Sequence, residues 1–189
     1  MYWCRSRLTA VFTSGIMLVL CASACKPNVK EMNFFDLKGY FTAQAAKLHK
    51  LNPSVLKTVT EKGISESKKL KIGDWERELG LFIGSDINVP AFKNSYKIID
   101  EDNLLIYKTN DPKLKVREIL IKKEKNKVKW ILIYYKTPPT RWMGVKVPSL
   151  DQTAEKLSYF PDSLYLIEKV QTVRFIGTNI YKIQGLIGK

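Results

Sequence analysis

Histidine and cysteine, the residues that most often hold metals or act as nucleophiles, are scarce in this sequence. It contains one histidine, His49, and three cysteines, Cys4, Cys21 and Cys25. With no second histidine, and with all three cysteines within the first 25 residues, His49 is a poor basis for a zinc site or a catalytic triad. No phosphate-binding glycine loop, G-x-S-x-G turn or H-E-x-x-H helix occurs. We therefore predict a non-catalytic protein with no metal site and no cofactor.

Groups of acidic residues that suggest acid–base chemistry are also missing, with one exception. Asp100, Glu101 and Asp102 are adjacent in the sequence. Acids are common in turns, however, and this spacing does not match a calcium-binding loop. We interpret the three carboxylates as turn residues.

Long uncharged stretches are absent except at the N-terminus. Leu8 to Leu20 has thirteen residues without a charge, follows Arg5 and Arg7, and precedes the small residues 22–24. A membrane-spanning helix needs about 20 apolar residues, so this stretch is too short to be a permanent span. A basic start, an apolar middle and a small-residue end are the parts of a secretory signal peptide. Residues 1–24 are therefore predicted to be removed on export.

The end of this segment resembles the lipobox of bacterial lipoproteins. Ala22-Ser23-Ala24 runs directly into Cys25, and in that family the cysteine after the cleavage point is acylated and becomes the N-terminus. The family usually has leucine three residues before the cysteine, where this chain has Ala22. Cys21 would restore a leucine there but would place bulky Leu20 where a small residue is required. The resemblance implies lipid attachment at Cys25 and a membrane-anchored place in the bacterial cell envelope, with the periplasmic side of the outer membrane favoured.

The same residues allow a second interpretation. Ala22-Ser23-Ala24 also has the A-x-A pattern of ordinary signal-peptide cleavage, which would release an unlipidated protein that begins at Cys25. Either cut leaves a single cysteine, so no internal disulfide can form and stability must come from core packing. The two interpretations differ only in the acylation of Cys25.

Basic residues outnumber acidic ones. The chain has 32 Lys and Arg against 18 Asp and Glu, and loss of residues 1–24 lowers the net charge from +14 to +12 because only Arg5 and Arg7 leave. Export makes nucleic acid an unsuitable partner, whereas anionic lipid head groups or an acidic envelope protein would be attracted. The lysines equally suit a structural role, in which they solubilise a β-rich surface and protect its edges. The basic stretch 122–127 is a predicted hairpin tip with the same two interpretations.

The remaining 165 residues suffice for one domain. We assign residues 25–32 to the lipidated N-terminus and a polar tether, and residues 33–189 to a single domain. Apolar residues at helical spacing predict an amphipathic helix over 33–51, capped by Asn33, and a second short helix over 74–83, capped by Asp74. Both helices are expected to pack against a sheet.

Most of the domain alternates between strand and turn patterns. Predicted strands form a hairpin over 54–71 and then cover 96–99, 104–108, 116–122, 129–136, 142–147, 153–159, 164–171, 172–176 and 180–187. Short connections favour an antiparallel meander, because parallel strands need long crossovers. Residues 130–135 are apolar on both faces, which predicts a central strand covered on both sides. The predicted fold class is α+β, with a large curved antiparallel sheet of about eight to ten strands.

Such an architecture is similar to the half-barrel of bacterial lipoprotein carriers and receptors, which hold acyl chains inside. The similarity concerns architecture and matches no motif. It implies an alternative to a binding or structural role for the anchored protein, namely a lipid or lipoprotein carrier with a cavity lined by Phe34, Phe41, Trp130 and Leu132. A filled interior would favour the first role, and an open apolar cavity of several hundred Å³ the second.

Overall fold

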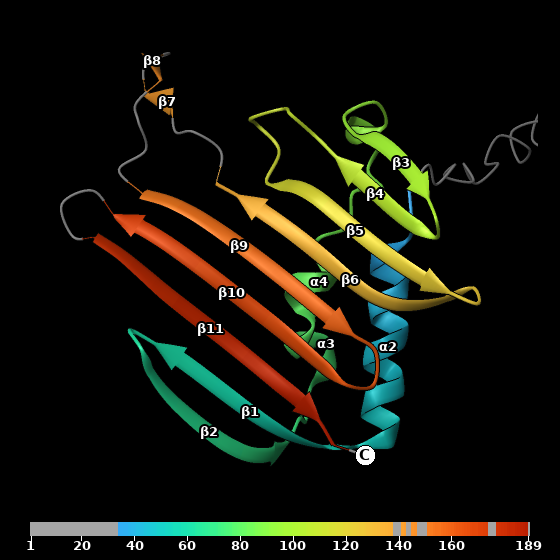
Figure 1. Cartoon of the computed structure of the whole chain (residues 1–189), viewed down its shortest axis with the longest axis vertical. Coiled ribbons are helices and arrows are strands. Elements are labelled where there is room, and N and C mark those ends of the chain that lie inside the picture. Colours follow the sequence, from blue (N-terminus) through green and yellow to red (C-terminus); the bar gives the residue numbers. More distant parts are fainter. Residues whose placement is uncertain (1–33, 138–140, 143–144, 147–150, 174–176, 189) are drawn as a thin grey trace, which may run out of the picture. The chain divides into compact units, whose positions relative to one another are not determined.

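The computed structural model describes residues 34–137, 141–142, 145–146, 151–173 and 177–188 (Figure 1). Residues 33–189 form one compact unit. The predicted signal peptide, the tether, Cys25 and the predicted helix cap Asn33 lie outside the described residues.

Nine strands of the described chain form one antiparallel sheet (Figure 1). The strands are β1 (Ser54–Glu61), β2 (Ile64–Lys71), β3 (Lys97–Glu101), β4 (Leu104–Lys108), β5 (Val116–Glu124), β6 (Lys127–Lys136), β9 (Asp151–Phe160), β10 (Leu164–Val173) and β11 (Gly177–Ile187). Their order is β2-β1-β11-β10-β9-β6-β5-β4-β3. Because β2 and β3 stand at opposite edges, the sheet is open. The β-rich antiparallel fold predicted from the sequence is confirmed.

The strand predictions need three corrections. Residues 142, 145 and 146 of the predicted strand 142–147 do not join the main sheet, since β7 (Arg141–Trp142) and β8 (Val145–Lys146) pair with each other. Residues 143, 144 and 147 lie outside the described residues. The predicted strands 164–171 and 172–176 were divided too early, because β10 continues to Val173, which pairs with Gly177 of β11. The sheet is also not a simple meander, because β1 pairs with β11 at the other end of the chain.

Three hairpins turn through two residues that both have positive φ. These loops are Lys62-Gly63, Asp102-Asn103 and Lys125-Asn126. Positive φ at both positions is the requirement of a type I′ turn, whose twist matches that of the flanking strands. Glycine and asparagine tolerate this conformation best, so the local sequence explains where the strands end.

The helices of the described chain all lie on one side of the sheet (Figure 1). They are α2 (Leu37–Leu51), α3 (Trp75–Glu78), α4 (Gly80–Ile83) and the 3₁₀ turn η2 (Pro90–Phe92). Helix α2 starts at Leu37, where the Asp36 carboxylate accepts a hydrogen bond from the backbone N–H of Gly39 at 2.8 Å. The predicted helix 74–83 is broken at Leu79, because Gly80, a weak helix former, follows it.

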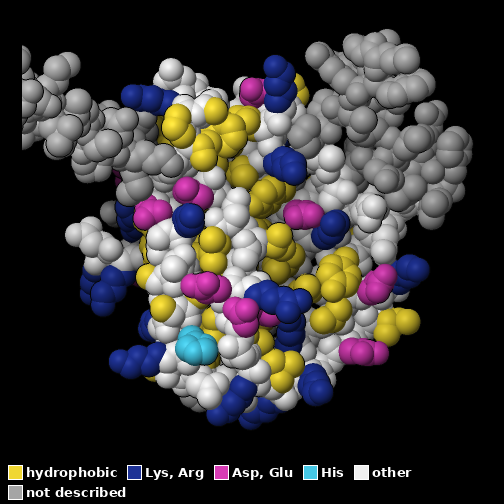
Figure 2. Space-filling model, turned by 180° about the vertical axis from the view of Figure 1, so that it is seen from behind, with side chains coloured by type: hydrophobic (Ala, Val, Ile, Leu, Met, Phe, Trp, Pro, Cys, Tyr) yellow, Lys and Arg dark blue, Asp and Glu magenta, His cyan; other side chains and the backbone are white. Residues whose placement is uncertain are grey.

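Apolar side chains fill the layer between the helices and the sheet. Phe41 of α2 is fully buried, and its ring lies 5.0 Å from that of Phe82 and 5.1 Å from that of Tyr159. Ile119, Ile121, Ile131, Ile133, Leu157 and Tyr165 complete the core from the sheet. The outer surface of the helix side carries charges of both signs between apolar side chains (Figure 2). Core packing therefore joins α2 to the middle of the sheet.

Candidate binding surface

One face of the sheet carries the core, and the described chain places no helix on the other (Figure 1). In β6, Ile131 and Ile133 are fully buried against the helices, whereas Trp130 and Leu132 alternate with them and are only partly buried. Successive side chains of a strand point to opposite faces. We call the face that carries Trp130 and Leu132 the open face.

Two neighbouring cross-strand rows make the open face apolar over most of its width. The first row contains Leu56, Leu186, Leu164, Phe160, Trp130 and Leu104, and the second contains Leu166, Leu132, Leu120, Ile106 and Ile99. We call these eleven side chains the apolar band. It reaches from β1 to β3, and none of its members belongs to the buried core.

The band is exposed at one end and continuous in the middle. Leu56 is 42% exposed and Leu186 is 39% exposed, although they are direct cross-strand partners on the adjacent strands β1 and β11. Ser158 of β9 is only 3% exposed and lies in register between Leu132 and Leu166. Its burial indicates that the side chains around it are closely packed.

A row of charged residues borders the band on one side. This charged row contains Lys182, Glu168, Lys156, Tyr134, Glu118, Lys108 and Lys97. The Nζ atoms of Lys156 and Lys182 each lie 3.9 Å from a carboxylate oxygen of Glu168, and the Lys156 ammonium lies 5.9 Å from the Tyr134 ring centroid. Most of the row is partly exposed and paired within itself, so it contributes little to stability.

Two lysines belong to the first apolar row. Lys69 of β2 stands at one end of the row, in register with Leu56, and Lys122 of β5 stands between Trp130 and Leu104. The Lys122 ammonium donates a hydrogen bond to the backbone carbonyl of Asp102 at 2.6 Å. Among the described residues Lys69 makes no ion pair. The open face thus combines an apolar band with lysines at one end of it, within it and in the charged row beside it.

The structure does not bring together the four residues predicted to line a carrier cavity. Phe34 and Phe41 are buried on the helix side of the sheet, whereas Trp130 and Leu132 lie on the open face. A sheet layer separates the two pairs. Strand β6 is central, as predicted, but the described helices cover only one of its faces.

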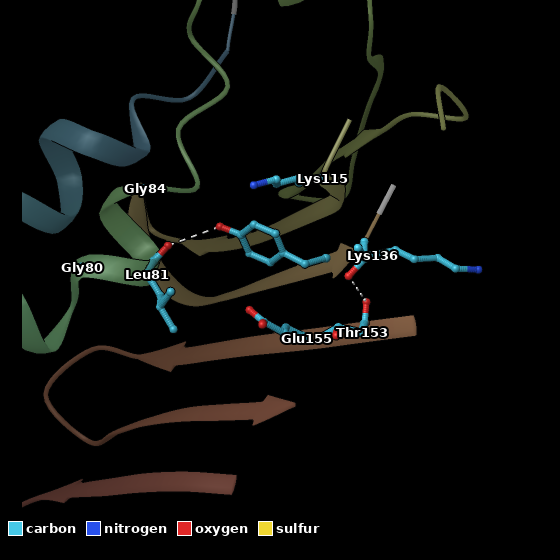
Figure 3. A pocket seen from close by; sticks show the side chains of 9 residues that line it. Gly80, Leu81, Gly84, Lys115, Lys136, Thr153 and Glu155 are labelled. Atoms are coloured by element: carbon cyan, nitrogen blue, oxygen red, sulfur yellow. Dashed lines mark hydrogen bonds between the residues drawn. The ribbon is translucent and has the colours of Figure 1, made fainter. Parts of the chain in front are cut away.

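A pocket of about 420 Å³ lies where α4 meets β5, β6 and β9 (Figure 3). Its wall includes Leu81 and its floor includes Tyr135, whose hydroxyl lies 2.5 Å from the Ser85 hydroxyl and donates to the Leu81 carbonyl at 3.3 Å. Burial raises the pKa of Tyr135. Glu155 at the rim is paired with Lys169 at 3.2 Å. The phenol is therefore held protonated and bonded, which suits a structural role.

A second hollow, of about 510 Å³, lies between α2 and α3 and contains His49, Asp74 and Glu76. The Asp74 carboxylate is occupied as the cap of α3, where it accepts from the backbone N–H of Arg77 at 2.9 Å. Of the three carboxylates interpreted as turn residues, only that of Asp102 lies in the hairpin turn, whereas Asp100 and Glu101 are the last two residues of β3. Within the described residues, no three His, Cys, Asp or Glu side chains are grouped as a metal site.

The residues of the open face are visible in the sequence, but their common surface is not. Residues 130–135 are apolar on both faces, and β1, β10 and β11 contain isolated leucines. Only the strand order shows that these residues lie on one surface, and their pattern indicates no specific ligand. In the part of the chain that the structure describes, no helix has the length and apolarity needed to cross a membrane. Comparison with known proteins found no matching family model, curated protein or solved structure.

Proposed function

We propose that this protein is a lipid-anchored lipoprotein of the bacterial cell envelope that binds a partner, without catalysis, through the open face of its sheet. The observation that carries the proposal is the apolar band, which spans eight of the nine strands of the described sheet. Soluble monomers rarely expose contiguous apolar patches of this kind unless the patch binds something. The lipobox-like residues that end at Cys25 supply the anchor in this proposal.

The lipid or lipoprotein carrier is kept as a second candidate because of the pocket beside α4. Its volume of about 420 Å³ lies within the range of ligand sites, and α4 contributes only a short wall. The aromatic packing of Phe41, Phe82 and Tyr159 fills the layer beneath α2, which favours the first proposal. Mass spectrometry of lipid extracts from the purified protein separates the two, since a carrier would retain stoichiometric lipid.

The anchor is tested by intact mass of the protein from the membrane fraction of its native host, compared with a Cys25→Ala variant. We expect the wild-type chain to begin at Cys25 and to carry acyl mass. The variant should carry no acyl mass and should not be retained by the washed membranes. A chain that begins at an unmodified Cys25 in the soluble fraction would contradict the anchor. Leu51→Ser, at an exposed position at the end of α2, is the control for general effects of substitution.

A further inference from the structure

We infer that the partner of the open face is the surface of a bilayer rich in anionic lipids, with the apolar band at the interface and the lysines of its margin on the head groups. The inference rests on the proposed function in one respect, because it takes the open face to be the binding surface. It adds the chemistry of the partner. Its support comes from the composition of the band, the charge of the face and the reach of the chain from Cys25.

The band has the residue types that suit a membrane interface. Leucines supply most of its area, Trp130 and Phe160 stand side by side at its centre, and Tyr134 follows Trp130 and Leu132 on the same face of β6. Tryptophan and tyrosine are favoured at the level of lipid head groups, where an apolar ring and a polar group are both satisfied.

The charge of the open face complements anionic lipids. Its two apolar rows and its charged row together hold six lysines, Lys69, Lys97, Lys108, Lys122, Lys156 and Lys182, against three glutamates, Glu101, Glu118 and Glu168. Lysine side chains lay their methylene groups along apolar surface and extend the ammonium toward polar groups. Such lysines at the margin of an apolar surface attract an anionic leaflet.

The same charge argues against a second copy of this chain as the occupant. Two open faces in contact would bring the lysine excess of each copy together, in a chain whose net charge is +12 after loss of residues 1–24. Like charges across a contact are unfavourable, whereas an anionic bilayer neutralises them. An acidic protein shares this complementarity, and an absence of Trp130 quenching by the anionic vesicles would favour it over the bilayer.

The anchor would keep the domain close enough for this contact. Residues 25–33 are nine residues, which span at most about 30 Å when fully extended. A domain held within that distance of a bilayer meets it at a high effective concentration, so that a weak surface interaction suffices. Weak docking by the open face is therefore consistent with the modest exposure of its individual side chains.

Quenching of Trp130 fluorescence tests the inference directly. The acylated protein is reconstituted through its anchor into phosphatidylcholine vesicles with or without about one third phosphatidylglycerol, each with brominated acyl chains as quencher. All proteins carry Trp142→Phe, so that Trp75 and Trp130 are the two tryptophans left after removal of residues 1–24. Trp75, which is 1% exposed in the core, is then a built-in reference. We expect at least about twofold more quenching with phosphatidylglycerol, and loss of this difference in Trp130→Phe.

Paired substitutions test the contact with Trp130 left in place as the probe. Leu56→Ser with Leu186→Ser removes the most exposed part of the band, and Lys69→Gln with Lys71→Gln removes charge at the β2 edge. Both are expected to reduce Trp130 quenching by at least about half. The matched control, Lys38→Gln with Lys50→Gln, changes exposed lysines of α2 on the other side of the sheet and should leave quenching unchanged.

The outcomes separate the inference from the proposed function. If the protein carries acyl mass at Cys25 but Trp130 is not quenched, the bilayer is not the partner, while the lipoprotein proposal stands. Sedimentation that shows a dimer abolished by Leu56→Ser would assign the face to a second copy and overturn the inference. If Cys25 is not acylated, the proposed anchor fails. Cosedimentation of the unmodified chain with the same vesicles then shows whether the open face binds an anionic bilayer without an anchor, and no cosedimentation would overturn the inference.

Discussion

At the scale of single residues, Gly185 explains the position of a buried tyrosine. Tyr165 pairs with Gly185 across β10 and β11, and its ring lies over the glycine where a Cβ atom would collide with it. Its hydroxyl donates a hydrogen bond to the Glu78 carboxylate, which also accepts from the Lys57 ammonium at 2.7 and 2.9 Å. A glycine inside a strand is unfavourable unless something approaches its backbone closely. Here the approaching group is the Tyr165 ring.

We expect Gly185→Ala to lower the free energy of unfolding by about 1–3 kcal/mol, the usual cost of forcing a methyl group into a packed core. The ring of Tyr165 would have to move away from Glu78 as well as from the new methyl group. Urea unfolding followed by circular dichroism measures the change. Gly80→Ala is the matched control, because open space surrounds a Cβ atom there and the position is helical. An unchanged midpoint for Gly185→Ala would show that the ring is not held as described.

At the scale of elements, the start of α2 shows a local conflict. Gly39 is an unfavourable residue for a helix, yet its missing Cβ makes room for the Asp36 carboxylate that caps the same helix. Gly39→Ala would improve helix propensity but displace the cap. These two effects are similar in size and opposite in sign, so position 39 and position 36 should be energetically coupled.

A double-mutant cycle measures this coupling. We expect Asp36→Ala to cost about 1 kcal/mol of stability and Gly39→Ala alone to change stability by less than about 0.5 kcal/mol. In the Asp36→Ala background, Gly39→Ala should stabilise by about 1 kcal/mol, because no carboxylate remains to be displaced. Equal effects of Gly39→Ala in both backgrounds would contradict the coupling. Thermal and urea unfolding of the four proteins give the values.

The elements also show how much of the structure is readable from sequence. Hairpins such as β1–β2 and β3–β4 were predictable, because their turn residues and alternating strands are local signals. The pairing of Val55 with Ile187 was not, since it joins distant segments and depends on packing of the whole sheet. The same limit applies to the binding surface. Trp130 and Leu132 were recognised as unusual, but their separation from Phe34 and Phe41 follows only from the strand order.

At the scale of the whole molecule, buried tyrosines make the stability of the fold depend on pH. Burial is the main cause that raises the pKa of Tyr40 and of Tyr96 to about 12, and it also raises the pKa of Tyr107, Tyr159 and Tyr165. Tyr40 and Tyr159 contact Phe41 of α2, and Tyr96 and Tyr107 contact Phe34. Ionisation would therefore weaken the attachment of α2 to the sheet at both ends of the core.

The sign of the pH dependence follows from these raised values. The folded protein holds the phenol protons more tightly than the unfolded chain, whose tyrosines ionise near pH 10. Stability from this source is thus fully present below pH 10 and is lost as the pH rises from 10 through about 12. For Tyr96, which is 8% exposed, the loss by pH 12 is of the order of 2 kcal/mol. Several tyrosines together should produce cooperative alkaline unfolding within this window.

Urea unfolding at fixed pH values from 9 to 12, with phenolate absorbance recorded in parallel, tests this prediction. Tyr96→Phe is the informative variant, because it removes one titrating phenol and one hydrogen bond, from its hydroxyl to the Val116 carbonyl at 2.9 Å. We expect it to be less stable than the wild type by about 1 kcal/mol at pH 9. This difference should fall to zero and change sign before pH 12, because only the wild type loses about 2 kcal/mol through ionisation of this phenol. Full ionisation of all tyrosines near pH 10 without unfolding would contradict the burial of these side chains. A constant difference between the two proteins at every pH would instead show that Tyr96 contributes its hydrogen bond but not its raised pKa to the stability of the core.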